Sequence, residues 1–233
     1  MYTLDFLATI SNCDAQGRLK LCSALQMMQD CSEKWLDSEP CLKQFFKDHN
    51  VAQLLAFRQV EVLRAPVCWE QLKVVSSVYS MKPKFGFRNT FVYGADGLPC
   101  YRTWSMGAFV DMSTGKLSPI DAPTLASLNL DEQREMNYGE RRIHVPAEGG
   151  AEAEPFRVMR SYIDYNLHVN NANYVRMGLE LLPDDFEVHG LKVEYRVAAK
   201  RGDTLAPTVF NCGDRWVVVL SLNGAISAVM EFT

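Results

Sequence analysis

The stretch Ser161–Val169 reads SYIDYNLHV, and a related stretch occurs earlier in the chain. The earlier copy is Ser11–Leu19, SNCDAQGRL, 150 positions upstream. The serine and the aspartate match, an amide faces an amide, and an aliphatic residue ends both copies, whereas Arg18 takes the position of His168. Each copy runs into a segment whose apolar residues have helical spacing. The repeat predicts two halves with one fold and a histidine only in the second.

A second correspondence supports the repeat. The stretch from Val60 to Leu72 mirrors the stretch from Val193 to Leu205, and both matches occur in the same order. Chance can supply one short phrase, but two ordered correspondences indicate duplication. We therefore expect a duplicated enzyme that has kept a single active site.

Composition limits the possible functions. With 233 residues, 48% of them hydrophobic, the chain can bury a sizeable core. Its formal net charge of −4 argues against nucleic acid as the main partner. No apolar run approaches the roughly 20 residues that span a bilayer, and the first residues do not resemble a secretion signal. We expect a cytoplasmic protein.

Motifs for metals and cofactors are missing. The seven cysteines are scattered, with no C-x-x-C pair and no zinc-type spacing to a histidine, so we expect small buried side chains. A calcium loop starting at Asp164 would need glycine and glutamate where Val169 and Val175 stand. No nucleophile elbow, P-loop or dinucleotide fingerprint occurs. We therefore expect no metal and no cofactor.

The pattern of the first half predicts a strand, a helix and then four strands. Ser23 with Gln26 suggests a capping box for a helix through Leu25–Trp35, closed by Pro40. The strands are expected at Leu54–Leu63, Gln71–Met81, Gly86–Tyr93 and Cys100–Met112, after an opening strand at Tyr2–Ile10. A helix followed by antiparallel strands indicates the α+β class.

The middle and the second half continue this plan. Short surface helices are expected at Ala122–Ala126 and Asp131–Glu135, then an exposed connector at Ala147–Pro155. The next helix is expected at Asn171–Leu182, and turn residues at Cys212–Asp214 and Asn223–Gly224 mark later hairpins. Within that helix Gly178 implies close packing against its backbone, because glycine costs about 1 kcal/mol relative to alanine.

The densest polar cluster is Asp164, Asn166 and His168, at a junction between a strand and a helix. The helix start near Asn170 points free amides and a positive dipole end toward this turn. Such amides can stabilise an oxyanion, and a histidine beside a carboxylate can act as a general base for water. These are the parts of an acyl hydrolase without a serine nucleophile. The alternative is purely structural: Asp164 and Asn166 form Asx turns, and Asn170 or Asn171 is the helix N-cap.

Asp164–Tyr174, with the pattern Asp-x-Asn-x-His-Val-Asn-Asn-x-x-Tyr, resembles the signature of acyl-ACP thioesterases, which consist of two tandem hotdog domains. The resemblance implies an N-terminal hotdog domain at 1–120, a linker at 121–155 and a C-terminal hotdog domain with the active site at 156–233. It implies that the chain hydrolyses fatty acyl-ACP to free fatty acid and holo-ACP. The residues that it assigns are Asp164, Asn166 and His168 for catalysis, and Asn171 and Tyr174 for substrate binding.

One position departs from the family pattern. Many members of the family carry a glutamate that helps to activate water where this chain has Ala198. Glu194 has the same strand parity but lies roughly 13 Å away along an extended chain. Attack by Asp164 through a covalent anhydride and direct attack by water both stay open. An acyl-CoA thioesterase and a non-catalytic binder of acyl chains or acyl-ACP are the alternative functions.

Two further expectations concern the substrate. An acyl tunnel in the first half could be lined by large apolar residues, which are otherwise ordinary core: Leu25, Met27, Met28, Trp35, Phe57 and Phe91. The acidic carrier protein predicts a basic docking patch, with Lys82, Lys84 and Arg88 as the first candidate and Arg141–Arg142 as the second. The fused halves would already form a pseudo-dimer, and a homodimer is possible.

Overall fold

The computed structural model describes residues 1–233, which form two compact units. Unit 1 contains Met1–Ala56 and Val62–Tyr138, and unit 2 contains Phe57–Glu61 and Gly139–Thr233. The strand β2 (Val51–Val62) thus contributes its first part, Val51–Ala56, and its last residue to unit 1 and its second part, Phe57–Glu61, to unit 2. The domain boundaries expected from the sequence, at 120 and 155, stay a prediction.

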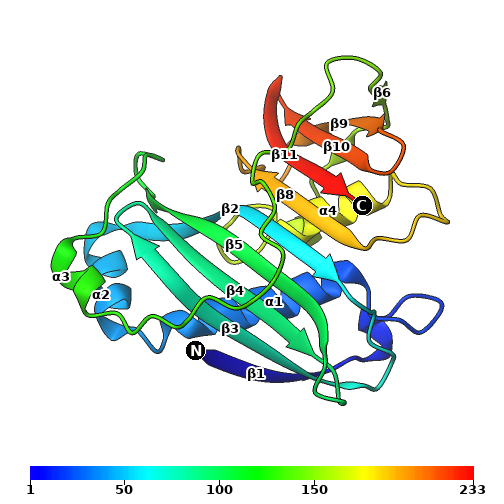
Figure 1. Ribbon diagram of the computed structural model, residues 1–233. Helices are drawn as coiled ribbons and strands as arrows, with labels where there is room; N and C mark the ends of the chain where they lie inside the picture. Colours follow the sequence, from blue (N-terminus) through cyan, green and yellow to red (C-terminus); the bar gives the residue numbers. More distant parts are fainter. The chain divides into compact units, whose positions relative to one another are not determined.

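Unit 1 is an antiparallel sheet with a long helix packed on it (Figure 1). The sheet order is β1-β3-β4-β5, followed by the first part of β2. The helix α1 packs against β1, β3 and β4. The remaining elements are β1 (Tyr2–Leu7), η1 (Ile10–Asn12), α1 (Leu21–Leu36), α2 (Pro40–His49), β3 (Gln71–Lys82), β4 (Phe85–Tyr93), β5 (Pro99–Asp111) and α3 (Ala122–Ala126).

Unit 2 repeats the plan with a shorter helix. Its sheet order is the second part of β2, then β8-β11-β10-β9, and both β6 and β7 pair with β9. The helix α4 packs against β11. The elements are β6 (Ala151–Glu152), β7 (Phe156–Arg157), η2 (Arg160–Tyr162), α4 (Asn171–Leu179), β8 (Gly190–Tyr195), β9 (Thr204–Asn211), β10 (Trp216–Leu222) and β11 (Ala225–Phe232).

The apolar face of α1 forms because Leu25, Met28 and Trp35 recur at helical spacing and face the sheet, where each is almost fully buried. All residues suggested for the acyl tunnel are buried. Burial is compatible with a tunnel lining and with an ordinary core. The α+β class and the double-hotdog plan expected from the sequence are confirmed.

The repeat seen in the sequence is confirmed by backbone hydrogen bonds. The amide of Asp14 donates to the carbonyl of Arg18 at 2.8 Å, and the amide of Asp164 donates to the carbonyl of His168 at 3.0 Å. The helices that follow begin 150 positions apart, as the two copies do. The two turns therefore share one backbone design and differ in their side chains.

The close packing expected at Gly178 is also confirmed. A Cβ atom added there would lie 2.8 Å from Sδ of Met230 and 3.0 Å from Cζ of Phe232. Both neighbours are on β11 and are fully buried. The absence of a side chain at this helical position therefore lets α4 approach its sheet.

The predicted helix starts and ends in the first half were partly wrong. The helix α1 begins at Leu21, and Ser23 lies inside it and is buried, so it does not cap the helix. The amide of Lys20 donates to the carbonyl of Asn12 at 2.9 Å, which sets the entry of the chain into the helix. Pro40, which was expected to close the first helix, is the first residue of α2. Proline is favoured there because the first N–H groups of a helix have no partner within the helix.

Four other predictions need correction. Asp131–Glu135 is not helical, because the amides of Asp131 and Arg134 donate to Val78 and Asn89 of the sheet. The connector at 147–155 contains β6, which pairs with β9, and α4 ends at Leu179 instead of Leu182. Four of the seven free cysteines are buried, but Cys41 is exposed and Cys68 and Cys212 are half-buried.

Candidate active site

Asp164, Asn166 and His168 lie in one tight turn between η2 and α4. A β-bridge between Ile163 and Val169 closes the turn. The side chain of Asp164 accepts a hydrogen bond from the amide of Asn166 at 2.9 Å. The three predicted residues are therefore brought together on one loop. His168 is half-buried and Asn166 is exposed.

The first copy uses its aspartate differently. Oδ1 of Asp14 accepts the amides of both Gln16 (3.0 Å) and Arg18 (2.8 Å), and Nε of Arg18 lies 3.7 Å from Oδ2. Oδ1 of Asp164 accepts the amide of Asn166 and not that of His168. More of the acceptor capacity of Asp164 therefore stays available for a ligand, a water molecule or an imidazole.

The start of α4 supplies backbone donors beside this turn. Asn170 is the N-cap, and its side chain accepts the amide of Ala172 at 3.0 Å, as the sequence suggested. The amide of Asn171 is not used by this cap. Asn171 is half-buried, and its carbonyl accepts a hydrogen bond from the hydroxyl of Tyr195 at 3.1 Å. An oxygen that approaches the turn can therefore meet the amide of Asn171 at the positive end of the helix.

Tyr174 joins the helix to the segment after β8. The side chain is only 3% exposed, and its hydroxyl accepts the amide of Ala199 at 2.8 Å. The carbonyl of Ala199 in turn accepts the amide of Val169 at 2.9 Å. The segment that contains Ala198 is thereby fastened to the candidate turn and to α4. Tyr174 is thus buried and hydrogen-bonded within the fold, and the parts of Asn171 and Tyr174 in substrate binding stay predictions.

Glu194 does not replace the family glutamate. Its carboxylate accepts the amide of Ile143 at 2.6 Å and pairs with Arg196 at 2.9 Å. Strand alternation places Tyr195, which contacts α4, on the opposite face of β8 from Glu194. The carboxylate of Glu194 is therefore engaged by Ile143 and Arg196, and the expectation that it lies too far from the turn stays a prediction.

Arg58 is a polar residue of this unit that the sequence analysis missed. It is only 4% exposed, its Nε has no hydrogen-bond partner, and burial lowers the pKa of its guanidinium group. It pairs across strands with Val193, on the same face as Tyr195. A single arginine at an inward position of the apolar strand Leu54–Leu63 is the signal that could have found it.

The expected docking patch is only partly free. Nη1 of Arg88 donates to the carbonyl of Ser32 at 2.7 Å, and its guanidinium group stacks on Trp35. Lys82 lies over the ring of Phe87, and Lys84 is exposed. Arg88 therefore belongs to the packing between α1 and β4. No group of three or more histidine, cysteine or acidic residues is arranged to hold a metal ion.

A helix packed on an antiparallel sheet, occurring twice, with a polar turn before the second helix, defines a double-hotdog protein of the thioesterase type. Family models described as the acyl-ACP thioesterase N-terminal domain and C-terminal domain match residues 1–128 and 146–212. The chain belongs to the acyl-ACP thioesterase family and is a thioester hydrolase that acts on fatty acyl-ACP.

Solved structures show the same fold at low identity. An acyl-ACP thioesterase from Bacteroides thetaiotaomicron superposes with a TM-score of 0.88 at 20% identity, covering 99% of this chain and 96% of the other. The 12:0-ACP thioesterase from Umbellularia californica gives a TM-score of 0.81 at 16% identity, covering 99% and 95%. The Escherichia coli protein YbaW covers 55% of this chain with 96% of its own, with a TM-score of 0.50 at 13% identity. No curated protein matches the chain. No helix is both long enough and apolar enough to cross a membrane.

Proposed function

We propose that the thioester of fatty acyl-ACP is hydrolysed at the turn that carries Asp164, Asn166 and His168. The observation that carries this proposal is the contrast between the two copies of the turn. Both copies share one backbone, but only the second combines a histidine, an aspartate with spare acceptor capacity and a helix capped by asparagine. The family assigns its catalytic residues to these three positions, which supports the same choice.

The proposed reaction begins with attack of water on the thioester carbon. His168 accepts the proton of the water while a new C–O bond forms, and the carbonyl oxygen becomes an oxyanion that the amide of Asn171 stabilises. Collapse of the intermediate breaks the C–S bond, and His168 returns the proton to the departing thiolate. Asp164 and Asn166 orient the imidazole and the water. Tyr174 positions the Ala198–Ala199 segment.

The first test replaces the proposed base. In His168→Ala we expect kcat/KM for acyl-ACP to fall by about 10²- to 10⁴-fold, because general-base catalysis typically contributes this much. Thiol release across acyl-ACPs of different chain length measures the effect. His144→Ala is the matched control, because His144 is strongly exposed and lies outside the turn. Full activity in His168→Ala with an unchanged fold would contradict the assignment.

The alternative functions differ in substrate or in turnover. Rates measured on acyl-CoA and acyl-ACP with one acyl chain separate a preference for CoA from a preference for the carrier protein. Ala198 is the observation that favours a non-catalytic binder, because it removes the family carboxylate from a segment fastened to the turn. Binding of acyl-ACP without thiol release would support that alternative.

The proposal also covers the partner, the cellular location and the oligomeric state of the protein. We infer a cytoplasmic enzyme whose partner is acyl carrier protein and which does not use nucleic acid. The net charge of −4 supports the last point. A homodimer is part of the proposal, and sedimentation of the purified chain tests it. We also retain the acyl tunnel lined by Leu25, Met28 and Trp35 as a proposal.

A further inference from the structure

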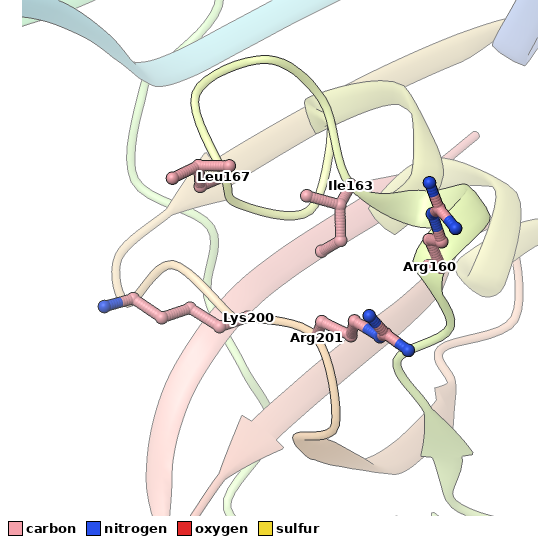
Figure 2. A pocket seen from close by; sticks show the side chains of 5 residues that line it. All are labelled: Arg160, Ile163, Leu167, Lys200 and Arg201. Atoms are coloured by element: carbon pink, nitrogen blue, oxygen red, sulfur yellow. The ribbon is translucent and has the colours of Figure 1, made fainter.

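An open hollow of about 400 Å³ lies beside the candidate catalytic turn and is lined by three cationic side chains (Figure 2). Ile163 and Leu167 of the turn contribute its apolar lining. Arg160 comes from η2, and Lys200 and Arg201 come from the segment that joins β8 to β9. Two separate segments of unit 2 therefore place cations around this hollow, and Figure 2 shows Arg160 and Arg201 on one side of it and Lys200 extending to the other.

The positive charges of this hollow are not neutralised within the protein. Other cations of the chain are paired with carboxylates, among them Arg64, Lys192 and Arg196. Arg160, Lys200 and Arg201 form no such pair, and all three are exposed. The nearby Asp203 accepts the backbone amide of Lys200 at 2.8 Å and makes no ion pair with its side chain. In a chain of net charge −4, this cluster is a local exception that favours an anionic ligand.

The first copy of the repeat provides an internal comparison. The two sequence correspondences assign an equivalent position in the first copy to each of the three cations. The equivalents of Arg160, Lys200 and Arg201 are Ile10, Val67 and Cys68. None of these equivalents is charged. The cationic cluster therefore occurs only in the copy that contains His168.

The two copies also differ in how the turn meets the neighbouring segment. In the first copy, the amide of Cys68 donates to the carbonyl of Gly17 at 2.8 Å and closes the turn against the neighbouring segment. The equivalent pair in the second copy is Arg201 and Leu167, and no hydrogen bond joins these residues; both line the hollow. Leu167 keeps the left-handed conformation of Gly17, with φ of 64° against 74°, although it carries a side chain. The hollow therefore lies at the position where the first copy has a backbone hydrogen bond between the turn and the neighbouring segment.

We propose that this hollow binds the phosphate group of the phosphopantetheine arm that carries the acyl thioester. Arginine and lysine donate charge-assisted hydrogen bonds to phosphate oxygens. Ile163 and Leu167 provide apolar contact for the carbon skeleton of the arm, and the volume falls within the usual range of ligand pockets. The proposal rests on the proposed function, because the arm must enter beside the turn that hydrolyses its thioester. Acyl-ACP and acyl-CoA both carry such a phosphate.

The test compares two substrates that differ only in the phosphate, acyl-4′-phosphopantetheine and acyl-pantetheine with one acyl chain. We expect the wild-type protein to prefer the phosphorylated substrate. In the double variant Lys200→Ala/Arg201→Ala, kcat/KM for the phosphorylated substrate should fall by about tenfold or more at low salt, while that for acyl-pantetheine stays unchanged. Arg160→Ala should also lower the ratio of kcat/KM for the phosphorylated substrate to kcat/KM for acyl-pantetheine.

A matched control removes the same charge elsewhere. Lys47→Ala/Lys116→Ala changes two exposed cations of unit 1 and should leave the ratio as in the wild type. An unchanged ratio in Lys200→Ala/Arg201→Ala would overturn the proposal. So would a loss confined to acyl-ACP, because the cations would then recognise carboxylates of the carrier protein. Equal losses on acyl-ACP, acyl-CoA and acyl-phosphopantetheine would support the phosphate.

Direct binding separates this proposal from the proposed function. Calorimetric titration of the wild type with 4′-phosphopantetheine and with pantetheine needs no turnover. Tighter binding of the phosphorylated compound, lost in Lys200→Ala/Arg201→Ala, would support the phosphate site even if no thioester is hydrolysed. Equal binding of both compounds would overturn it even if His168→Ala abolishes hydrolysis.

Discussion

At the scale of single residues, the two copies of the turn show how one backbone serves two purposes. In the first turn, both the backbone amide and the side chain of Arg18 contact the carboxylate of Asp14. The polar groups of this turn therefore bind each other. His168 at the equivalent position makes no such bond to Asp164. With histidine in place of arginine, the side chains of Asp164 and His168 are not bonded to each other. Both can therefore contact a substrate or a water molecule.

Ala198 is the residue whose replacement tells most about turnover. It is exposed and directly precedes Ala199, which is hydrogen-bonded to Val169 and to Tyr174. A carboxylate at position 198 would lie beside the turn, where it could orient or deprotonate water. We expect Ala198→Glu to raise kcat for acyl-ACP by about tenfold or more, measured by thiol release.

The control for this change is Ala198→Gln, which has a similar shape and no base. An equal gain in Ala198→Gln, or no gain in Ala198→Glu, would show that water activation does not limit the native protein. Acyl-ACP affinity should stay the same in both variants. A change in affinity would indicate that position 198 contacts the substrate itself.

The candidate site could be predicted from sequence only where its residues are neighbours in the chain. Asp164, Asn166 and His168 share one turn, so their spacing alone brings them together. The hollow could not be predicted, because Arg160 and Lys200 belong to segments that meet only in the fold. Arg58 was missed although an arginine in an apolar strand is a visible signal, because its neighbours on β8 are known only from the strand pairing.

At the scale of elements, the spacing of α4 from its sheet is set by Gly178. We expect Gly178→Ala to lower the free energy of unfolding by about 1–2 kcal/mol, because overpacking outweighs the better helix propensity of alanine. Met230 and Phe232 are fully buried, so the atoms that the new methyl group would meet can shift only within the core. Urea unfolding of the purified protein measures the effect.

A second change identifies the clash as the cause. Met230→Ala alone should destabilise the protein, because it removes a buried side chain. In the double variant with Gly178→Ala, the new methyl group has room, so the two losses should not add. If the losses in unfolding free energy of the two single variants add in the double variant, the effect of Gly178→Ala does not come from contact with Met230.

Glu70 links the start of β3 to the end of β2 within unit 1. Its carboxylate accepts hydrogen bonds from Nη1 and Nη2 of Arg64 at 3.0 and 2.6 Å and from the amide of Val67 at 3.0 Å. The Arg64 guanidinium group lowers the pKa of Glu70 below its ordinary value. A lowered folded-state pKa stabilises the fold above the unfolded pKa, and this contribution is lost as the pH falls through the folded pKa.

We therefore expect Glu70→Gln to lower the free energy of unfolding by about 2 kcal/mol near pH 7. The difference from the wild type should shrink as the pH falls below the ordinary pKa of a glutamate, about 4.3, and then through the lowered pKa of Glu70. Asp96→Asn is the control, because Asp96 lies 3.4 Å from Arg64 and is half exposed. A difference that persists unchanged at low pH would contradict this origin.

Helices and strands with clearly periodic spacing of apolar residues were located well from the sequence, but the ends of the helices were not. The four strands of the first half were located to within a few residues because alternation and turn residues mark them. The helix α2 was missed, since a proline was interpreted as a stop when it also favours a first helical position. Asp131–Glu135 was wrongly predicted helical because its amides bind strands that are distant in sequence.

At the scale of the whole molecule, duplication explains both the shared plan and the unequal chemistry. Each unit has a helix on an antiparallel sheet, preceded by the same tight turn. The histidine, the open hollow and the three cations all occur in unit 2. This concentration of distinct features in one copy is consistent with a single active site per chain.

The chain is nevertheless not divided at one point. Phe57–Glu61 of β2 pairs with β8 of unit 2, with Arg58 opposite Val193 and Val60 opposite Leu191. A fragment of residues 139–233 would lack this strand and would present β8 as an unpaired edge. We therefore expect this fragment to be unfolded or aggregated, as judged by circular dichroism and size-exclusion chromatography.

Restoring the missing strand should reverse that result. A version of 139–233 with residues 51–62 attached through a flexible linker supplies the partner of β8 and should recover a sheet spectrum and a cooperative thermal transition. The same addition with residues 57–61 scrambled is the control, because it keeps length and composition but not the register with β8. A folded, monomeric 139–233 fragment would show that unit 2 does not depend on β2, and that the duplicated halves are separable at residue 139.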